Sequence, residues 1–274
     1  MRERAMAVRM MTVGVAGLGA AGGAVAARLL AGAEGLRLGA VSVRDEARAR
    51  AALPGFEGPF LAPDALHAVC DVVVECLPPA LFRTVAEPTL KAGRIFMPLS
   101  VGQLLAHWDL VALAEAHGGR IVAPTGALLG FDAVRAVAEG EVRSVTMVTR
   151  KPPAGLAGAP WLVRNAIDID NLAAPLRVYQ GSVREGALGF PANLNVAAAL
   201  SLAGVGPDRT LLEVWADPTV DRNTHSISVE ADSARFSMTI ENVPSPGNPR
   251  TGRITALSVI AALRSLVSPL RVGS

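Results

Sequence analysis

The stretch "TVGVAGLGAAGGAVAARLL", residues 12–30, constrains the fold of this chain more than any other feature. A short β-branched run leads into the turn Gly17-Leu18-Gly19-Ala20-Ala21-Gly22, and an alanine-rich segment with helical periodicity follows. In this order of strand, turn and helix, Gly17 permits a tight turn, Gly19 lets the backbone approach a pyrophosphate, and Gly22 lets the helix pack closely on the strand. We therefore expect the helix N-terminus to bind phosphates, with contacts from Gly17, Gly19, Ala20, Ala21 and Gly22.

The same stretch is long and apolar enough to suggest a membrane helix or a signal segment. Its glycines would weaken a spanning helix, and the nucleotide-binding interpretation explains each of them. We therefore expect no membrane partner, and we expect the residues before Met11 to be a short extension.

Composition limits the remaining classes of protein. The chain has 274 residues, 51% of them hydrophobic, which is enough to fill the core of one large domain or two ordinary ones. Its net charge is +2 and no block of like charges stands out, so we expect a small-molecule partner rather than a nucleic acid. Cys70 and Cys76 show neither a disulfide framework nor metal-ligand spacing, which predicts a cytoplasmic protein without a metal site.

A second strand, "LRLGAVSV", is followed by Arg44 and Asp45, about 20 residues beyond the glycine turn, where the residue that contacts the ribose is expected. An acid there favours NAD through the ribose 2′-hydroxyl, whereas an arginine accommodates the 2′-phosphate of NADP. Because the sequence offers one residue of each kind, both cofactors stay open, as does the alternative of a solvated strand end.

The rest of the first half alternates strands with helices. Strands are predicted in "DVVVECLP" and "RIFMPLS", and helices in "ALFRTVAEPTLKAG" and over residues 103–117. This alternation predicts a Rossmann-type, doubly wound parallel sheet in an α/β protein. Ligands collect at the carboxyl ends of such strands, so Ser100, with Gly102 beside it, is expected near the cofactor.

The second half is richer in strand-like runs, with one alanine-rich helix expected over residues 192–203. Alternating runs such as "SISV" and "RFSMTI" predict an α+β domain with a mostly antiparallel sheet. We place a dinucleotide-binding domain at residues 11–122, with a C-terminal helix at 251–268 packing back on it. A substrate and dimerisation domain is expected at residues 123–250.

Five blocks in the second half carry a resemblance to a known family. In chain order, "GALLGFDAV", "RKP", "PANLNVAAALSLAGVGPDRT", "ADPTVDRNTHSI" and "ENVPSPGNPRTGRITALSVIAALR" resemble the L-aspartate dehydrogenases, and the likeness runs from about Thr12 to Leu266. The resemblance implies reversible, NAD(P)-dependent oxidation of L-aspartate through iminoaspartate to oxaloacetate and ammonia, in some organisms feeding NAD biosynthesis. It also implies a homodimer.

The resemblance carries over to three positions. His225, in the N-x-H pattern, matches the acid/base of the family, and Ala127 and Asn195 match positions that contact the nicotinamide cofactor. Leu129 and Gln103 replace residues that are usually smaller, and "ECLPP" departs from the usual run, so these changes leave the substrate preference open.

The chemistry of amine oxidation requires a base for the proton, and the ordinary pKa of histidine suits that task. Without the resemblance, His225 could equally be a histidine in a polar surface loop. The two carboxylates of aspartate require cationic or N–H donors, and the candidates in the second half are Lys151, Arg164, Arg209 and Arg222. Lys151 is placed first because "RKP" is one of the blocks that carry the resemblance and lies at a strand end. Asn193 and Asn223 are further candidate substrate contacts.

Three other functions share parts of this sequence pattern. A semialdehyde or glyceraldehyde-phosphate type of dehydrogenase needs a cysteine nucleophile in the second domain, and both cysteines lie in the first. A related dehydrogenase that acts on another small amino or hydroxy acid stays open, and so does a non-catalytic NAD(P)-binding redox sensor.

Overall fold

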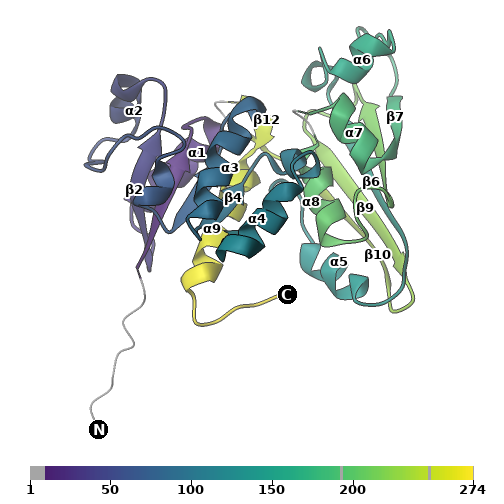
Figure 1. Cartoon of the computed structure of the whole chain (residues 1–274). Coiled ribbons are helices and arrows are strands. Elements are labelled where there is room, and N and C mark those ends of the chain that lie inside the picture. The colour runs from purple at the N-terminus through teal and green to yellow at the C-terminus, as the bar shows by residue number, and fades with distance from the viewer. Residues whose placement is uncertain (1–9, 192–193, 246–247, 274) are drawn as a thin grey trace. The chain divides into compact units, whose positions relative to one another are not determined.

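The computed structural model describes residues 10–191, 194–245 and 248–273, and the chain forms two compact units (Figure 1). The first unit consists of the described residues up to Ser100, Trp108–Pro124 and Ala256–Val272. The second consists of Val101–His107, Thr125–Thr255 and the end of the chain.

The first unit is built on a five-stranded parallel sheet in the order β2-β1-β3-β4-β5. The chain leaves β1 toward β2 on one side and then crosses to β3 on the other, which makes the gap between β1 and β3 the topological switch point. The strands are β1 (Met11–Ala16), β2 (Leu36–Ser42), β3 (Val72–Glu75), β4 (Ile95–Pro98) and β5 (Arg120–Ile121).

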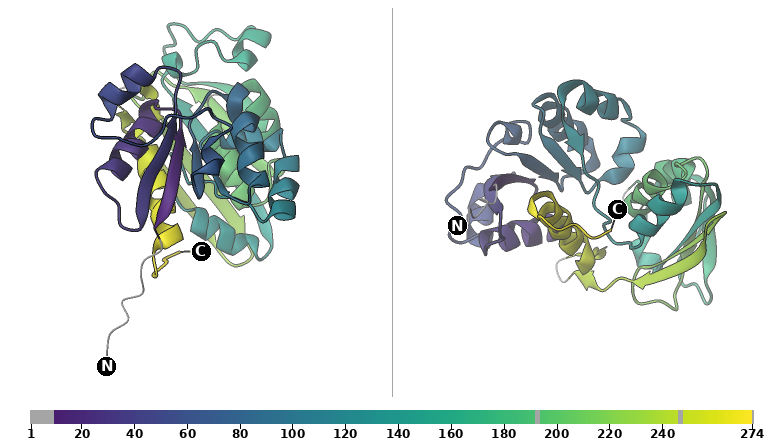
Figure 2. Two further views of the ribbon diagram at one scale, coloured as in Figure 1. Left: turned by 60° about the vertical axis from the view of Figure 1, so that its left-hand side comes forward. Right: turned by 90° about the horizontal axis from the view of Figure 1, so that it is seen from below.

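Helices cover both faces of this sheet, as Figure 2 shows for α1 and α9 on one side and α3 and α4 on the other. Val72 and Val74 belong to the core that includes α1 and α9, whereas Phe96 stacks edge-on against Phe82 of α3. Burial of both faces explains why these strands are continuous apolar runs. The helices are α1 (Ala20–Leu30), α2 (Glu46–Ala52), α3 (Phe82–Lys91), α4 (Asp109–His117) and α9 (Arg253–Val267), with 3₁₀ turns η1 (Leu66–Ala68) and η2 (Pro79–Leu81).

The second unit is built on a mixed sheet in the order β10-β9-β6-β8-β7. Three of its four strand pairs are antiparallel, and β6 with β8 is the parallel pair. The strands are β6 (Val142–Lys151), β7 (Leu176–Ser182), β8 (Thr210–Ala216), β9 (Thr224–Ala231) and β10 (Arg235–Glu241), with a small hairpin of β11 (Pro244–Ser245) and β12 (Asn248–Gly252).

The helices α5, α7 and α8 lie on one face of the mixed sheet, and the described part of this unit places no helix on the other face (Figures 1 and 2). Alternate residues of β6 and β9 are accordingly buried under the helices. The helices are α5 (Phe131–Ala138), α6 (Pro160–Arg164), α7 (Val183–Gly189) and α8 (Asn195–Ala203), with 3₁₀ turns η3 (Val101–Leu105) and η4 (Pro153–Gly155).

The predicted fold class is confirmed, and several predicted boundaries are wrong. The helix expected over residues 103–117 is two segments, η3 and α4, and the Gly102 N–H of η3 donates to Asn195 Oδ1. The run "PLRVYQGSVRE" was expected as strand throughout, yet α7 begins at Val183 because Ser182 caps it by accepting from Glu185 N. The C-terminal helix is α9, and its Ala256, Val259, Ile260 and Leu263 lie in the core of the first unit.

Candidate active site

The glycine turn between β1 and α1 has the geometry that its sequence predicted. Gly17 has a φ of 96°, and a Cβ there would lie 2.7 Å from the Cys76 carbonyl oxygen. A Cβ on Gly22 would lie only 2.0 Å from the Gly17 carbonyl oxygen, so α1 can approach the turn this closely only with glycine. Beside Gly19 the described chain leaves open space, on the side where a ligand would approach.

The N-terminus of α1 is suited to an anion. Gly19 is the N-cap residue and provides no side-chain cap, and no acidic residue lies in the first turn. The N–H groups of Ala20 and Ala21 therefore meet neither a capping side chain nor a nearby carboxylate. These residues fit the pyrophosphate of a dinucleotide, and the phosphate-binding role of the turn stays a prediction.

The two candidates for ribose recognition behave differently. Asp45 is the N-cap of α2, and its Oδ1 accepts from Arg48 N at 2.9 Å. Arg44 is exposed, two residues after the end of β2. One carboxylate oxygen of Asp45 is therefore committed to the helix, which favours Arg44 as the residue that meets the ribose side of the cofactor.

The carboxyl ends of β3 and β4 are joined by a buried carboxylate. Glu75, the last residue of β3, has no exposed surface, and its Oε1 accepts from Leu77 N at 2.8 Å. Ser100 donates from its N–H to Oε2 and from its Oγ to Oε1, both at 3.1 Å. Ser100 therefore lies at the carboxyl edge of the parallel sheet with its hydroxyl engaged with Glu75, and its contact with the cofactor stays a prediction.

His225 is the second residue of β9 and faces the helix-covered side of the second unit. Only 3% of it is exposed, and its Nδ1 lies 3.2 Å from Thr149 Oγ1. Thr149 is its direct neighbour on β6 in the strand register. His225 is thus a buried residue of a strand, and the alternative of a surface loop is wrong.

Burial and the nearby Lys151 ammonium lower the pKa of His225 to about 3. Lys151 is the last residue of β6, two residues beyond Thr149 on the same face, and only 5% of it is exposed. A neutral imidazole and a buried cation therefore lie together at one end of the sheet.

An ion pair between Arg150 and Asp217 fixes the end of β6. Arg150, which points to the opposite face, pairs with the buried Asp217 at 2.9 Å and lies over the Trp215 ring at 4.7 Å. Asp217 also accepts from the N–H and the hydroxyl of Thr219, and its N–H donates to the Lys151 carbonyl. The backbone of Lys151 is thereby held in place.

Ala127 and Asn195, the predicted nicotinamide contacts, are both held by polar partners. Asn195 begins α8 and its Oδ1 accepts from Gly102 N at 3.1 Å. The Ala127 carbonyl accepts from Asn242 Nδ2 at 3.0 Å. Asn242 is 3% exposed, and its N–H donates to the carbonyl of Asn223, two residues before His225.

Sequence reasoning missed Thr149, Asn242 and Glu75. Thr149 and Asn242 lie 76 and 17 residues from His225 along the chain, and only strand pairing brings them near it. Glu75 was detectable as the one acid inside an apolar strand run. Of the remaining predicted contacts, Asn223 stays a prediction and Asn193 lies outside the described residues.

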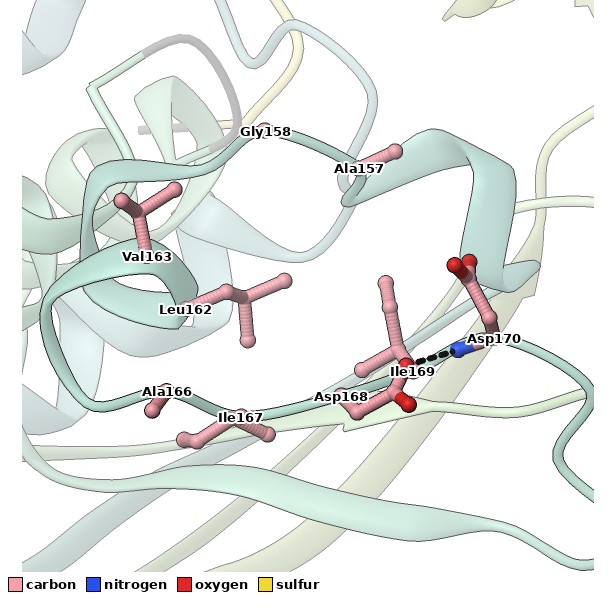
Figure 3. Close-up of a pocket in the computed structure, with 9 residues that line it drawn as sticks. All are labelled: Ala157, Gly158, Leu162, Val163, Ala166, Ile167, Asp168, Ile169 and Asp170. Atoms are coloured by element: carbon pink, nitrogen blue, oxygen red, sulfur yellow. Dashed lines mark hydrogen bonds between the residues drawn. The ribbon is translucent and has the colours of Figure 1, made fainter.

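A separate pocket of about 380 Å³ opens beside α6 (Figure 3). It is lined by Leu162, Val163, Ile167 and Ile169, with Asp168 at its rim accepting from Asp170 N at 2.8 Å. None of the predicted site residues lines it, and its apolar walls offer no donor set for a dicarboxylate.

None of the helices in the described part of the chain is long and apolar enough to cross a membrane. Within the same residues, no group of three or more His, Cys, Asp or Glu side chains could hold a metal ion.

Family models match both halves of the chain. Residues 17–124 match the model described as "Homoserine dehydrogenase, NAD binding domain", and residues 132–266 match "Aspartate dehydrogenase, C-terminal". Among solved structures, aspartate dehydrogenase from Thermotoga maritima superposes with a TM-score of 0.72 at 24% identity, covering 96% of this chain and 99% of that one. A homoserine dehydrogenase from Thiobacillus denitrificans has a TM-score of 0.60 at 16% identity, covering 94% and 73%. These two likenesses concern the fold.

Sequence relatives are closer than these structures. The L-aspartate dehydrogenase of Bradyrhizobium diazoefficiens is 58% identical over 266 residues, which cover 96% of this chain and 94% of that protein. L-aspartate dehydrogenase 3 of Bordetella bronchiseptica is 54% identical, with 96% and 97% covered. With relatives of 58% and 54% identity matched over nearly its whole length and a family model matching residues 132–266, the chain belongs to the L-aspartate dehydrogenase family.

Proposed function

We propose that this protein is an NAD(P)-dependent oxidoreductase that converts L-aspartate, through iminoaspartate, to oxaloacetate and ammonia, and that the reaction is reversible. The observation that carries the proposal is the neutral, buried His225 held beside Thr149 and Lys151 in a chain that also has a dinucleotide turn. Bound NAD(P)+ would supply the hydride acceptor.

In this proposal His225 handles the proton of the amine. With the hydrogen on Nδ1, the ring would donate to Thr149 Oγ1, 3.2 Å away. The Nε2 lone pair would then take a proton from the substrate nitrogen as the Cα–H bond is broken. The resulting imine is attacked by water, and the C–N bond breaks to give oxaloacetate and ammonia. The imidazolium can return its proton to the imine nitrogen, and the neutral ring can then receive a proton from the attacking water.

Lys151 is proposed to bind a carboxylate of the substrate. A pKa of about 3 makes His225 a weak base before substrate arrives. A bound carboxylate would offset the positive charge of Lys151 and add a negative charge nearby, and both changes raise the pKa of the histidine toward the working range. Substrate binding would in this way activate the base.

The direct test is to incubate the purified protein with L-aspartate and either NAD+ or NADP+ at alkaline pH and follow the absorbance of the reduced cofactor. We expect turnover with aspartate, and a His225→Ala variant with kcat lower by roughly 10² to 10⁴ at unchanged cofactor affinity. Homoserine, glutamate and malate test the alternative substrates that Leu129 and Gln103 left open. Cofactor binding without turnover on any of them would favour the redox-sensor alternative.

We also propose a cytoplasmic homodimer that binds neither nucleic acid nor membrane, with its iminoaspartate available for NAD biosynthesis. Cys70 and Cys76 are free thiols, which suits a reducing compartment. The helix-free face of the mixed sheet, where Trp215 lies between Arg150 and Arg177, is the candidate dimer surface. Light scattering on a size-exclusion column measures the oligomeric state, and addition of an iminoaspartate-consuming enzyme tests whether the intermediate is released.

A further inference from the structure

Glu75 is a buried acid that the proposed mechanism does not use. It has no exposed surface and ends β3, where it pairs with Ala16 of β1 on one side and Pro98 of β4 on the other. Ala16 directly precedes the glycine turn. Glu75 therefore lies at the switch point of the parallel sheet, where a dinucleotide enters.

The carboxylate accepts three hydrogen bonds from two different loops. Leu77 N comes from the loop after β3, and the N–H and hydroxyl of Ser100 come from the loop after β4. The two N–H groups can only donate, and each meets a different oxygen of Glu75, which suits an ionised carboxylate. The Ser100 hydroxyl also lies 3.5 Å from the Leu77 carbonyl oxygen. Burial raises the pKa of Glu75, and the hydrogen bonds from Ser100 and Leu77 oppose that rise.

The loop that Glu75 holds packs directly on the phosphate-binding turn. The Cys76 carbonyl oxygen lies 2.7 Å and Leu77 Cδ2 lies 3.1 Å from where a Gly17 Cβ would be. Cys76 N also donates to the Ala16 carbonyl at 2.8 Å. A shift of the loop after β3 would therefore displace the glycine turn as well.

The charge of Glu75 needs an explanation beyond packing. A buried carboxylate loses its hydration, and the described residues place no cationic side chain in an ion pair with it. When it is ionised, Glu75 therefore has a negative potential at the switch point, with no ion-pair partner among the described residues.

We propose that Glu75 is a positioning residue for the nicotinamide end of the cofactor, and that its charge favours the oxidised ring, which is cationic, over the reduced ring, which is neutral. This inference rests on the proposed NAD(P)-dependent function. The pyrophosphate and riboses are the same in both redox forms, so repulsion between them and Glu75 cancels in the ratio of the two dissociation constants. That ratio isolates the charge of the ring.

The test is to measure by calorimetry the Kd values of NADP+ and NADPH, and of NAD+ and NADH, for wild type and Glu75→Gln. We expect Kd(oxidised)/Kd(reduced) to rise roughly tenfold in the variant. The matched control is Ser100→Ala, which removes one hydrogen-bond donor and leaves Glu75 in place. It should raise the Kd values of the oxidised and reduced cofactors by similar factors, so that their ratio stays within about twofold of wild type.

A Gln at this position places an amide N–H against backbone donors, so the variant can fail to fold. Glu75→Ala removes the charge without adding a donor and serves as the second variant, with thermal unfolding recorded for each. A folded Gln or Ala variant with the wild-type ratio would overturn the inference. Failure of the proposed function is seen separately, as cofactor binding without aspartate turnover, which leaves the ratio measurable.

Discussion

Thr149 Oγ1 and His225 Nδ1 lie 3.2 Å apart across the neighbouring strands β6 and β9, and neither residue is appreciably exposed. The strand register places the two residues directly opposite each other, so the imidazole is oriented by the sheet itself. The contact leaves the second ring nitrogen as the proton acceptor if Nδ1 carries the hydrogen.

The first prediction concerns this contact. Thr149→Val keeps the shape of the side chain and removes its only hydrogen-bonding atom, so the imidazole loses its orienting partner. We expect kcat for aspartate oxidation to fall by roughly tenfold with little change in cofactor Kd. Thr149→Ser, which keeps the hydroxyl, should retain most of the activity, and equal losses in both variants would indicate a packing role instead.

The second prediction concerns the pH dependence of stability. The pKa of His225 falls from 6.5 to about 3 on folding, so between these values the unfolded chain binds a proton that the folded chain does not. The free energy of unfolding should therefore decrease as pH falls through this window, by up to about 1.4 kcal/mol per pH unit from this group.

Urea unfolding of wild type and His225→Gln at several pH values measures this effect. The variant lacks the titrating group, so the difference in slope between the two curves reports on His225 alone. If the free energy of unfolding depended on pH in the same way for both proteins, the pKa of His225 would not change on folding, as expected for a hydrated histidine. Addition of a dicarboxylate inhibitor should raise the pKa of His225 in wild type, and less so in Lys151→Met.

The third prediction uses two glycines of one turn as a matched pair. A Cβ at position 22 meets the Gly17 carbonyl at 2.0 Å, whereas a Cβ at position 19 meets nothing within 4 Å. Gly22→Ala should thus lower the Tm and raise the Kd of the cofactor. Gly19→Ala should leave the Tm near wild type and still raise the cofactor Kd, because its methyl group occupies space for the pyrophosphate. Unchanged cofactor affinity in Gly19→Ala would place the phosphates elsewhere.

The fourth prediction separates Arg44 from Asp45. Asp45 caps α2, so Asp45→Ala should cost about 1 kcal/mol of stability and change the NADP+/NAD+ preference little. Arg44→Ala should raise KM for NADP+ more than for NAD+, because the guanidinium is the donor for a 2′-phosphate. Steady-state kinetics with both cofactors measure these KM values. A large loss of kcat/KM with NAD+ alone in Asp45→Ala would instead identify Asp45 as the residue that contacts the ribose.

The fifth prediction concerns Asn242, whose Nδ2 holds the Ala127 carbonyl. Asn242→Asp removes this donor and places a carboxylate beside a carbonyl oxygen, so the turn that carries Ala127 should shift and KM for the cofactor should rise by roughly tenfold. Protonation of the new carboxyl at lower pH restores a donor, so the defect should shrink as pH falls. Asn242→Ala is the control without that pH dependence.

Much of the fold followed from local patterns. The glycine turn, the apolar strands buried on both faces and the ten-residue alternation of β6 each depend on neighbours in the chain, so the sequence predicted a parallel sheet with a second, mostly antiparallel one. Helix α7 could also have been predicted, because Ser182 and Glu185 have the spacing of a capped helix start. The hairpin of β11 and β12 could not be predicted in this way, since the prolines and glycines of "PSPGNPRTG" give no strand periodicity.

By itself, then, the sequence determined the class of fold, the phosphate-binding turn and His225 as the candidate base. Tertiary structure decided the partners: Thr149 beside the imidazole, Asp45 bound to its own helix, and Glu75 between two loops. The physical reason is that periodicity and turn chemistry act between near neighbours in the chain. Burial, and with it the low pKa of His225 and the raised pKa of Glu75, arises only when distant strands pair and exclude water.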